Sequence, residues 1–181
     1  MLIEADRCLL LVVDLQEKMV PALADGAAVV AGAAWLVRVA QRIGVPVAAV
    51  EQYPKGLGRL VPDVRDLLPP EAIVPKAHFS CVAAQCLAAM PAGDRAQFVV
   101  CGAETHVCVI QSALDLAEDG KDVFVVADAV GSRRDFDRDM ALARMRDEGL
   151  SIVTREMVAF EWLRRADTAL FRDVNKAFLR Q

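Results

Sequence analysis

Six short apolar runs alternate along this chain with longer segments of helical periodicity, and this alternation constrains the fold more than any other feature. The runs are rich in β-branched residues and show no polar alternation, as expected for strands that are covered on both faces. They span residues 8–13, 45–50, 72–74, 97–101, 123–127 and 151–153. Strands that alternate with helices are joined by right-handed crossovers. The sequence therefore predicts an α/β fold, a doubly wound three-layer sandwich in which a six-stranded parallel sheet carries helices on both faces.

The segments between the runs have recognisable helix ends. We expect a helix over 29–43 that stops at Gly44, a second over 107–117 that stops near Gly120, and a third over 136–145 that stops at Gly149. Two more amphipathic segments follow, over 156–165 and 168–179. No repeat, low-complexity tract or Gly/Ser linker interrupts the chain, so we expect one domain over 1–181.

Composition and charge exclude several classes of protein. Hydrophobic residues make up 55% of the 181 residues, which excludes intrinsic disorder. The net charge of −4 gives no electrostatic footprint for nucleic acid, and the arginines of 133–146 lie among acidic residues. No apolar run approaches the roughly 18 residues of a membrane span, and no basic flank precedes the first run. We therefore expect no nucleic-acid partner, no membrane partner and no signal peptide.

The five cysteines are an odd number in a chain that is large enough to fold without disulfides. They argue against a disulfide framework and favour a reducing, cytoplasmic location. Cys8 and Cys101 lie inside predicted strands, where packing explains them. Cys81 and Cys86 are five residues apart on an expected helix and do not share a face. A zinc site that combined them with His78 and His106 would have no recognised ligand spacing.

Polar residues follow the predicted strands where ligands bind in parallel sheets, at the carboxyl ends. We expect these residues to lie together at one edge, so that a carboxylate, an ammonium and the Cys108 thiol converge. In strand order they are Asp14, then Glu51, Gln52 and Tyr53, then Lys76, then residues 102–106, and finally Asp128.

Cys108 is the best placed of the five thiols. Thr105 is expected to cap the helix that follows, which places Cys108 in its first turn. The helix dipole and free N–H groups there are expected to lower the thiol pKa from about 8.5 and to hold a developing oxyanion. From position alone, a buried small hydrophobic residue at a helix start remains an equal alternative. The chain has no dinucleotide fingerprint, Ser-centred nucleophile elbow or Cys-x-x-Cys pair.

Three segments in order and at matching spacing resemble the isochorismatase-like cysteine hydrolases: residues 10–16 (LLVVDLQ), 75–80 (PKAHFS) and 102–109 (GAETHVCV). Residues 51–58 and 127–130 look most like isochorismatase-domain proteins with no settled substrate. The resemblance spans nearly the whole chain and implies the sheet predicted above. It also implies a catalytic triad of Asp14, Lys76 and Cys108. It implies a cis peptide between Ala103 and Glu104, with the backbone N–H groups of Glu104 and Cys108 as an oxyanion hole.

This chain departs from the nicotinamidase-type members, which carry a metal-binding Asp-x-His after the second strand. Glu51, Gln52 and Tyr53 stand there, and the chain has only two histidines. We therefore expect no catalytic metal and no other cofactor, and nicotinamide is not the expected substrate. Members named for isochorismate cleave a vinyl ether, and some lack the cysteine, whereas Cys108 indicates acyl chemistry on a C–N bond.

The resulting hypothesis is a cysteine-dependent hydrolase that cleaves the amide, imide or carbamoyl bond of a small molecule through a thioester. The expected substrate pocket contains Gln16, Gln52, Tyr53, Phe79, Thr105 and His106. Supporting hydrogen bonds are the default role for Gln16, Glu51 and Asp128. Two alternatives remain: a binding or scaffold protein that has lost turnover, and a thiol-based redox-responsive protein.

The C-terminal segment carries apolar side chains that either cover the core or form an interface. They are Phe160, Leu163, Phe171, Val174 and Phe178. Because the resembling family is commonly oligomeric, we expect a homo-oligomer, at least a dimer.

Overall fold

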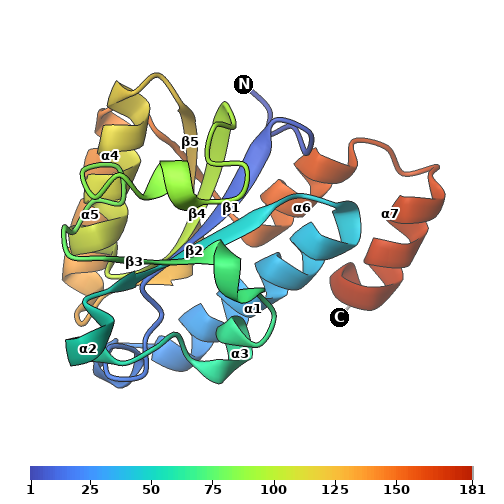
Figure 1. Ribbon diagram of the computed structural model, residues 1–181. Helices are drawn as coiled ribbons and strands as arrows, with labels where there is room; N and C mark the ends of the chain where they lie inside the picture. Colours follow the sequence, from blue (N-terminus) through green and yellow to red (C-terminus); the bar gives the residue numbers. More distant parts are fainter. Residues whose placement is uncertain (181) are drawn as a thin grey trace.

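The computed structural model describes residues 1–180 and contains one six-stranded sheet in which every strand pair is parallel (Figure 1). The spatial order is β3-β2-β1-β4-β5-β6. This confirms the predicted α/β class and the six-stranded parallel sheet. The strands are β1 (Cys8–Val13), β2 (Val47–Gln52), β3 (Ile73–Lys76), β4 (Gln97–Ala103), β5 (Asp122–Gly131) and β6 (Ser151–Val153).

Helices cover both faces of the sheet. In Figure 1, α4 (Ile110–Glu118) and α5 (Asp135–Asp147) lie on one side, and α1 (Gly26–Ile43) and α6 (Arg155–Leu163) on the other. The alternation of side chains along β1 divides the core in the same way. Leu10 and Val12 pack in the cluster beneath α1 and α6, whereas Leu9, Leu11 and Val13 pack in the cluster beneath α4 and α5. Each face of the sheet therefore has its own hydrophobic core.

Local capping signals set the ends of several helices. Asp25 accepts a hydrogen bond from the Ala28 N–H at 3.2 Å at the start of α1, and Gly44 ends that helix as predicted. Thr154 caps α6, and Thr168 caps α7 (Ala169–Val174). The remaining elements are α2 (Pro54–Leu57), α3 (Pro62–Arg65), the 3₁₀ turns η1 (Val20–Ala22), η2 (Pro70–Ala72) and η3 (Cys86–Ala89), and the π-helical turns η4 (Thr105–Val109) and η5 (Asn175–Leu179).

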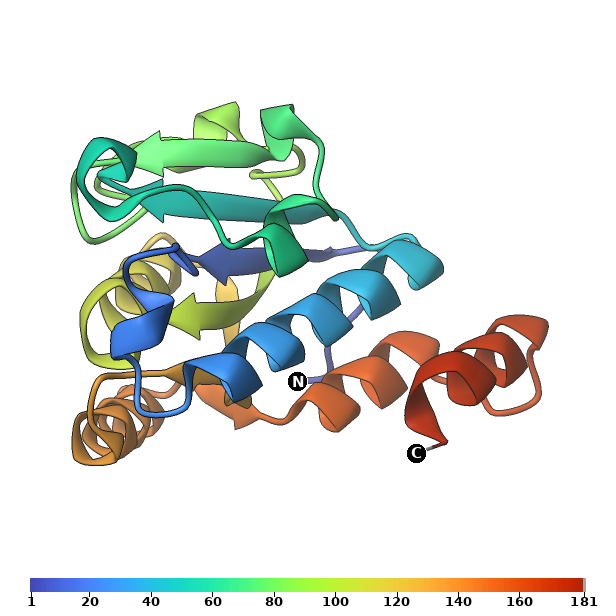
Figure 2. The same cartoon turned by 90° about the horizontal axis from the view of Figure 1, so that it is seen from below.

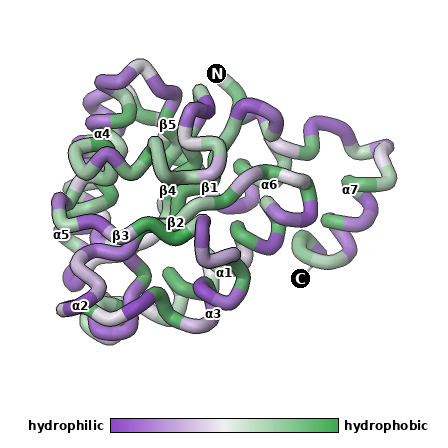
Figure 3. Tube along the Cα trace, in the orientation of Figure 1, coloured by the Kyte–Doolittle hydropathy of each residue, from purple (hydrophilic) through white to green (hydrophobic). Residues whose placement is uncertain are grey.

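Within residues 1–180, α1 is the one helix long and apolar enough, by length and composition alone, to cross a membrane. More than half of it is buried. It lies along the strands with α6 beside it (Figure 2). In Figure 3 the most hydrophobic stretches follow the strands, and hydrophilic stretches gather at the periphery. The apolar face of α1 is therefore explained by its place in the core.

The expected helix around Cys81 and Cys86 is wrong, because residues 81–85 form turns and only η3 follows. The helix expected over 136–145 forms as α5, but its expected apolar face is only partly buried. Met145 is buried as expected, whereas Phe136 and Met140 are exposed and Ala141 is buried in their place. Of the expected C-terminal anchors, Leu163 and Val174 are buried, Phe171 and Phe178 are partly buried, and Phe160 is exposed.

Strand ends differ from prediction where polar residues continue the ladder. β2 runs through Glu51 and Gln52, and β3 runs through Lys76, so these residues end strands rather than follow them. β5 runs past Asp128 to Gly131 because its register against β4 shifts between Val100 and Gly102. The irregular stretch turns Asp128 away from the predicted edge. Its carboxylate accepts hydrogen bonds from the backbone N–H and Nε of Arg155 at 2.9 and 3.0 Å, at the start of α6.

Candidate active site

Four polar side chains, from the ends of β1, β2 and β3 and from the turn after β4, meet at the carboxyl edge of the sheet. The Lys76 Nζ lies 2.7 Å from Asp14 Oδ2 and 2.6 Å from Gln52 Oε1. The Cys108 Sγ lies 3.9 Å from the same Gln52 oxygen. β2 stands between β1 and β3, so Gln52 lies between the carboxylate and the ammonium that these strands carry. The structure therefore brings together the three residues predicted as a triad and adds Gln52.

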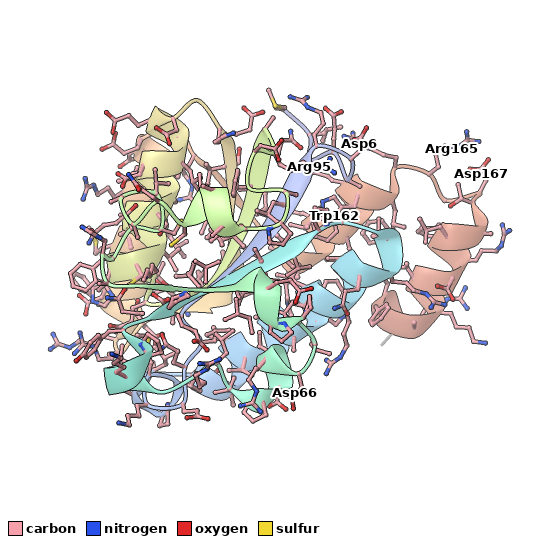
Figure 4. All side chains as sticks on the ribbon, viewed as in Figure 1. Asp6, Asp66, Arg95, Trp162, Arg165 and Asp167 are labelled. Carbon is pink, nitrogen blue, oxygen red and sulfur yellow. The ribbon has the colours of Figure 1, made fainter. Side chains whose placement is uncertain are left out.

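The Lys76–Asp14 ion pair is fully buried, with both side chains 0% exposed. By contrast, the pair of Arg165 and Asp167, labelled in the loop between α6 and α7 in Figure 4, is solvated on both sides. A buried pair has a large desolvation cost and contributes to stability only if its remaining polar atoms find partners. Asp14 Oδ1 has no hydrogen-bond partner within residues 1–180. Such a cost at a strand end is typical of a functional site.

The backbone around Asp14 is strained and depends on a glycine. Asp14 has a φ of 49°, in the left-handed region that non-glycine residues rarely adopt. Gly102, paired with Val13 on the neighbouring strand, has a φ of 120°. A Cβ at Gly102 would lie 2.0 Å from the Val13 carbonyl oxygen. Only glycine lets β4 approach β1 this closely at the site.

The turn that carries Cys108 follows β4 directly. The peptide between Ala103 and Glu104 is cis, at the position that the family resemblance implies. Residues 105–109 form one π-helical turn before α4 begins, and the N–H groups of Val107 and Val109 both donate to the Glu104 carbonyl at 3.1 Å. Thr105 is not the expected N-cap. Its side chain is completely buried, and its Oγ1 has no partner within residues 1–180.

Burial and charge set the protonation of the site. Burial raises the pKa of Asp14, and the positive charge of Lys76 opposes that rise. Burial also raises the pKa of the Cys108 thiol, and the Asp14 carboxylate raises it further, against the opposing charge of Lys76. The expected lowering of the thiol pKa by the helix terminus is therefore wrong for the unliganded site. Both effects favour the protonated thiol of Cys108 beside the Lys76–Asp14 pair.

A pocket of about 290 Å³ opens onto Cys108. This volume is at the small end for ligand sites and suits a small molecule. Two expected pocket residues, Gln52 and Phe79, line it. The other lining residues are Lys18, Met19, Ala22, Leu57, Glu104, Val107, Cys108 and Arg133.

The other expected pocket residues lie outside the lining. Gln16 is fully buried; its Nε2 donates to the Gln52 and Gly58 carbonyls at 2.9 and 2.7 Å. Tyr53 is 58% exposed, and the ring of His106 bonds Ser132 Oγ at 3.0 Å. Like Thr105, these residues are not part of the pocket lining. Glu51 also has a supporting role, because it accepts the Leu60 N–H at 2.8 Å.

Sequence reasoning missed the charged rim of the pocket. Arg133 Nε donates to Glu104 Oε1 at 2.8 Å, which ties the segment after β5 to the turn before Cys108. Lys18 lies on the loop after β1. Neither directly follows a predicted apolar run, so the strand-end rule gave no signal for them. Within residues 1–180, no group of three or more His, Cys, Asp or Glu side chains could hold a metal ion.

Comparison with known proteins agrees with this geometry. The isochorismatase domain family matches residues 8–157. Isochorismatase domain-containing protein 2A of Mus musculus is 37% identical over 176 residues, covering 93% of this chain and 81% of the mouse protein. The MAR1 ribonuclease structure from Caenorhabditis elegans has 32% identity and a TM-score of 0.88, covering 99% of this chain and 93% of that one. YcaC from Pseudomonas aeruginosa, solved with hexane-2,5-diol and covalent acrylamide, has 25% identity and a TM-score of 0.89, covering 99% and 92%. The chain belongs to the isochorismatase family, a family of hydrolases.

Proposed function

We propose that this protein is a cysteine-dependent hydrolase that cleaves a C–N bond in a small amide, imide or carbamoyl compound through a thioester intermediate. One observation carries the proposal: a fully buried Lys76–Asp14 ion pair lies beside a thiol that lines a pocket of small-molecule size. A carboxylate base, a cation and a thiol are the groups that nucleophilic acyl transfer requires.

The first step moves a proton from the Cys108 thiol to Asp14. With ordinary pKa values near 4 and 8.5, this transfer would cost about 6 kcal/mol. Burial raises the pKa of Asp14 and so makes the carboxylate a better base, while it also raises the pKa of the Cys108 thiol, so the transfer depends on Lys76. Because Lys76 stays beside both groups, the negative charge moves from oxygen to sulfur without losing its counter-ion.

The thiolate then attacks the substrate carbonyl, and the backbone N–H groups of Glu104 and Cys108 stabilise the oxyanion. Asp14 returns its proton to the leaving nitrogen as the C–N bond breaks and the thioester remains. It next takes a proton from the water that attacks the thioester. As the C–S bond breaks, Asp14 passes this proton to the departing Cys108 sulfur, which releases the acid and restores the thiol and the carboxylate. Gln52 Oε1, bound to Lys76 and near Cys108, keeps the ammonium in place through these steps.

A hydrolysis screen tests the proposal. Amides, imides and carbamoyl compounds are incubated with the wild-type protein, Cys108→Ala and Cys86→Ala, and ammonia or acid release is measured. Cys86 is a matched control because it is as buried as Cys108, in the same core cluster, but does not line the pocket. We expect turnover by wild type and Cys86→Ala alone. Equal product release by Cys108→Ala would remove the thiol from the mechanism.

The alternative functions give different results in the same assays. A scaffold protein would show no Cys108-dependent turnover and no preferential labelling of Cys108 over Cys8 and Cys101. A redox-responsive protein would show reversible oxidation of Cys108 without hydrolysis. One structural relative is named a ribonuclease, so RNA is included in the screen. The net charge of −4 and the small pocket favour a small-molecule substrate over RNA.

We also propose that the protein is cytoplasmic and forms a homo-oligomer. All five cysteines are free, which fits a reducing compartment. Several large apolar side chains remain exposed on the single chain, including Phe136 at 72% and Met140 at 54% on α5. Light scattering at micromolar concentration should give at least twice 19.6 kDa, and a mass near 19.6 kDa would contradict the oligomer.

A further inference from the structure

The charges that line the pocket do not cancel. Two cationic side chains, Lys18 and Arg133, line it together with one acidic side chain, Glu104. Deeper in the site, the Lys76–Asp14 pair is internally neutral. The lining therefore has a formal charge of +1, although the chain as a whole carries −4.

Both cations have donors left for a ligand. Lys18 Nζ donates to the Gly56 carbonyl at 2.9 Å and makes no ion pair with a carboxylate of residues 1–180. Glu104 bonds Arg133 through Nε, and the two terminal nitrogens of the guanidinium make no hydrogen bond to the described residues. The Arg133 side chain lines the pocket and is 61% exposed, so it is accessible to a ligand from solvent.

The rest of the wall is mostly apolar and gives a ligand few other polar partners. Phe79, Leu57 and Met19 form much of it, with Ala22 and Val107 beside them. A carboxylate that enters such a pocket loses water and needs charged donors in return. A guanidinium with two free terminal nitrogens and a lysine ammonium supply such donors.

We propose that the substrate is an amide or carbamoyl compound that carries a carboxylate, which Lys18 and Arg133 bind while the scissile carbonyl lies at Cys108. This inference rests on the proposed hydrolase function and adds a substrate class to it. The carboxylate neutralises the surplus charge of the lining. A neutral amide of the same length leaves that charge uncompensated and binds more weakly.

Binding to a protein that cannot turn over tests this directly. Succinamate and butyramide have the same four-carbon primary amide and differ in the terminal carboxylate. In the Cys108→Ala protein, titration followed by NMR should show succinamate binding about tenfold more tightly, an advantage that shrinks with added salt. Adding Lys18→Met to the Cys108→Ala protein should reduce the affinity advantage of succinamate over butyramide by about threefold. Adding Lys121→Met should leave it unchanged, since that lysine also donates to a backbone carbonyl but lies outside the pocket.

Turnover by the protein that keeps Cys108 separates the proposed carboxylate site from the proposed hydrolase function. Cys108-dependent hydrolysis of both amides with equal kcat/KM would overturn the carboxylate site and leave the hydrolase proposal standing. Preferential binding of succinamate that is weakened by Lys18→Met would support the carboxylate site even if no amide were hydrolysed. Equal binding of the two compounds, or an equal loss with Lys121→Met, would also overturn the carboxylate site.

Discussion

Replacing Lys76 with methionine isolates what the buried cation does, because methionine keeps most of the volume and removes the charge. The Lys76 Nζ is the cation that pairs with the Asp14 carboxylate, at 2.7 Å from Oδ2. The variant therefore leaves a completely buried carboxylate without its counter-ion. Breaking a buried pair in this way costs about 3–5 kcal/mol.

The same loss should appear in catalysis. Without Lys76, the pKa of Asp14 rises further, so at a given pH more of the carboxyl group holds a proton and cannot accept one from Cys108. The thiolate also loses its counter-ion. If the 3–5 kcal/mol enters the barrier to thiolate formation, turnover falls by about 10²–10⁴-fold. This is measured as kcat on any substrate whose hydrolysis requires Cys108.

The stability defect should depend on pH in a defined direction. A carboxyl group whose pKa is raised in the folded state stabilises the protein fully below its unfolded pKa near 4, and this contribution is lost as pH rises through the folded pKa. The loss is larger in the variant because its Asp14 pKa is higher still. Urea unfolding should therefore show a difference between wild type and Lys76→Met that is smallest near pH 4 and grows towards pH 8.

The double variant Asp14→Asn with Lys76→Met is the control. Removing both charges leaves no unpaired buried ion, so it should recover much of the stability lost in Lys76→Met but none of the activity. Wild-type rates in Lys76→Met, or a double variant that unfolds as easily as the single one, would refute the reasoning.

Three further predictions follow from the same geometry. Asp14→Asn alone should lower the pKa of Cys108, because the Asp14 charge raises it and Lys76 remains. Iodoacetamide should then label Cys108 several-fold faster at pH 7, although turnover is lost; slower labelling would contradict the effect assigned to the Asp14 charge. Gly102→Ala should cost at least about 2 kcal/mol more in urea unfolding than Gly120→Ala, because both have a positive φ but a Cβ at Gly120 would meet nothing within 4 Å. Gln52→Leu removes the oxygen that contacts both Lys76 and Cys108, so steady-state kinetics should show kcat falling about 10–100-fold with a smaller change in KM. An unchanged kcat would show that Gln52 contributes only to packing.

The sequence predicts the convergence of Asp14, Lys76 and Cys108 because parallel strands end at one edge whatever their order. It does not predict Gln52 as the bridge. That role depends on β2 standing between β1 and β3, a fact of strand order that apolar runs do not encode. It also depends on β2 continuing through two polar residues, which the pattern of buried strands places outside the strand.

Asp128 and Thr105 show a second reason for failure. Asp128 follows an apolar run, yet β5 continues through a register shift that no composition signal marks, and the side chain meets α6 instead of the site. Thr105 is a good N-cap by residue type, but the turn after β4 is π-helical and buries its hydroxyl. Both outcomes depend on backbone geometry set by tertiary packing, whereas capping and strand-end rules assume regular elements.

The protonation of the resting site decides between hydrolysis and redox sensing. A redox-sensing cysteine is a thiolate at rest, with a low pKa and open access to oxidant. Cys108 is 2% exposed, and burial and the Asp14 carboxylate both raise the pKa of its thiol. We therefore expect hydrogen peroxide at pH 7 to oxidise Cys108 no faster than an ordinary free thiol, as measured by mass spectrometry of the alkylated protein. In Asp14→Asn, where Lys76 is left to stabilise the thiolate, oxidation should speed up. Rapid oxidation of the wild type and no acceleration in the variant would show that Asp14 does not hold Cys108 as a thiol and would favour the redox function.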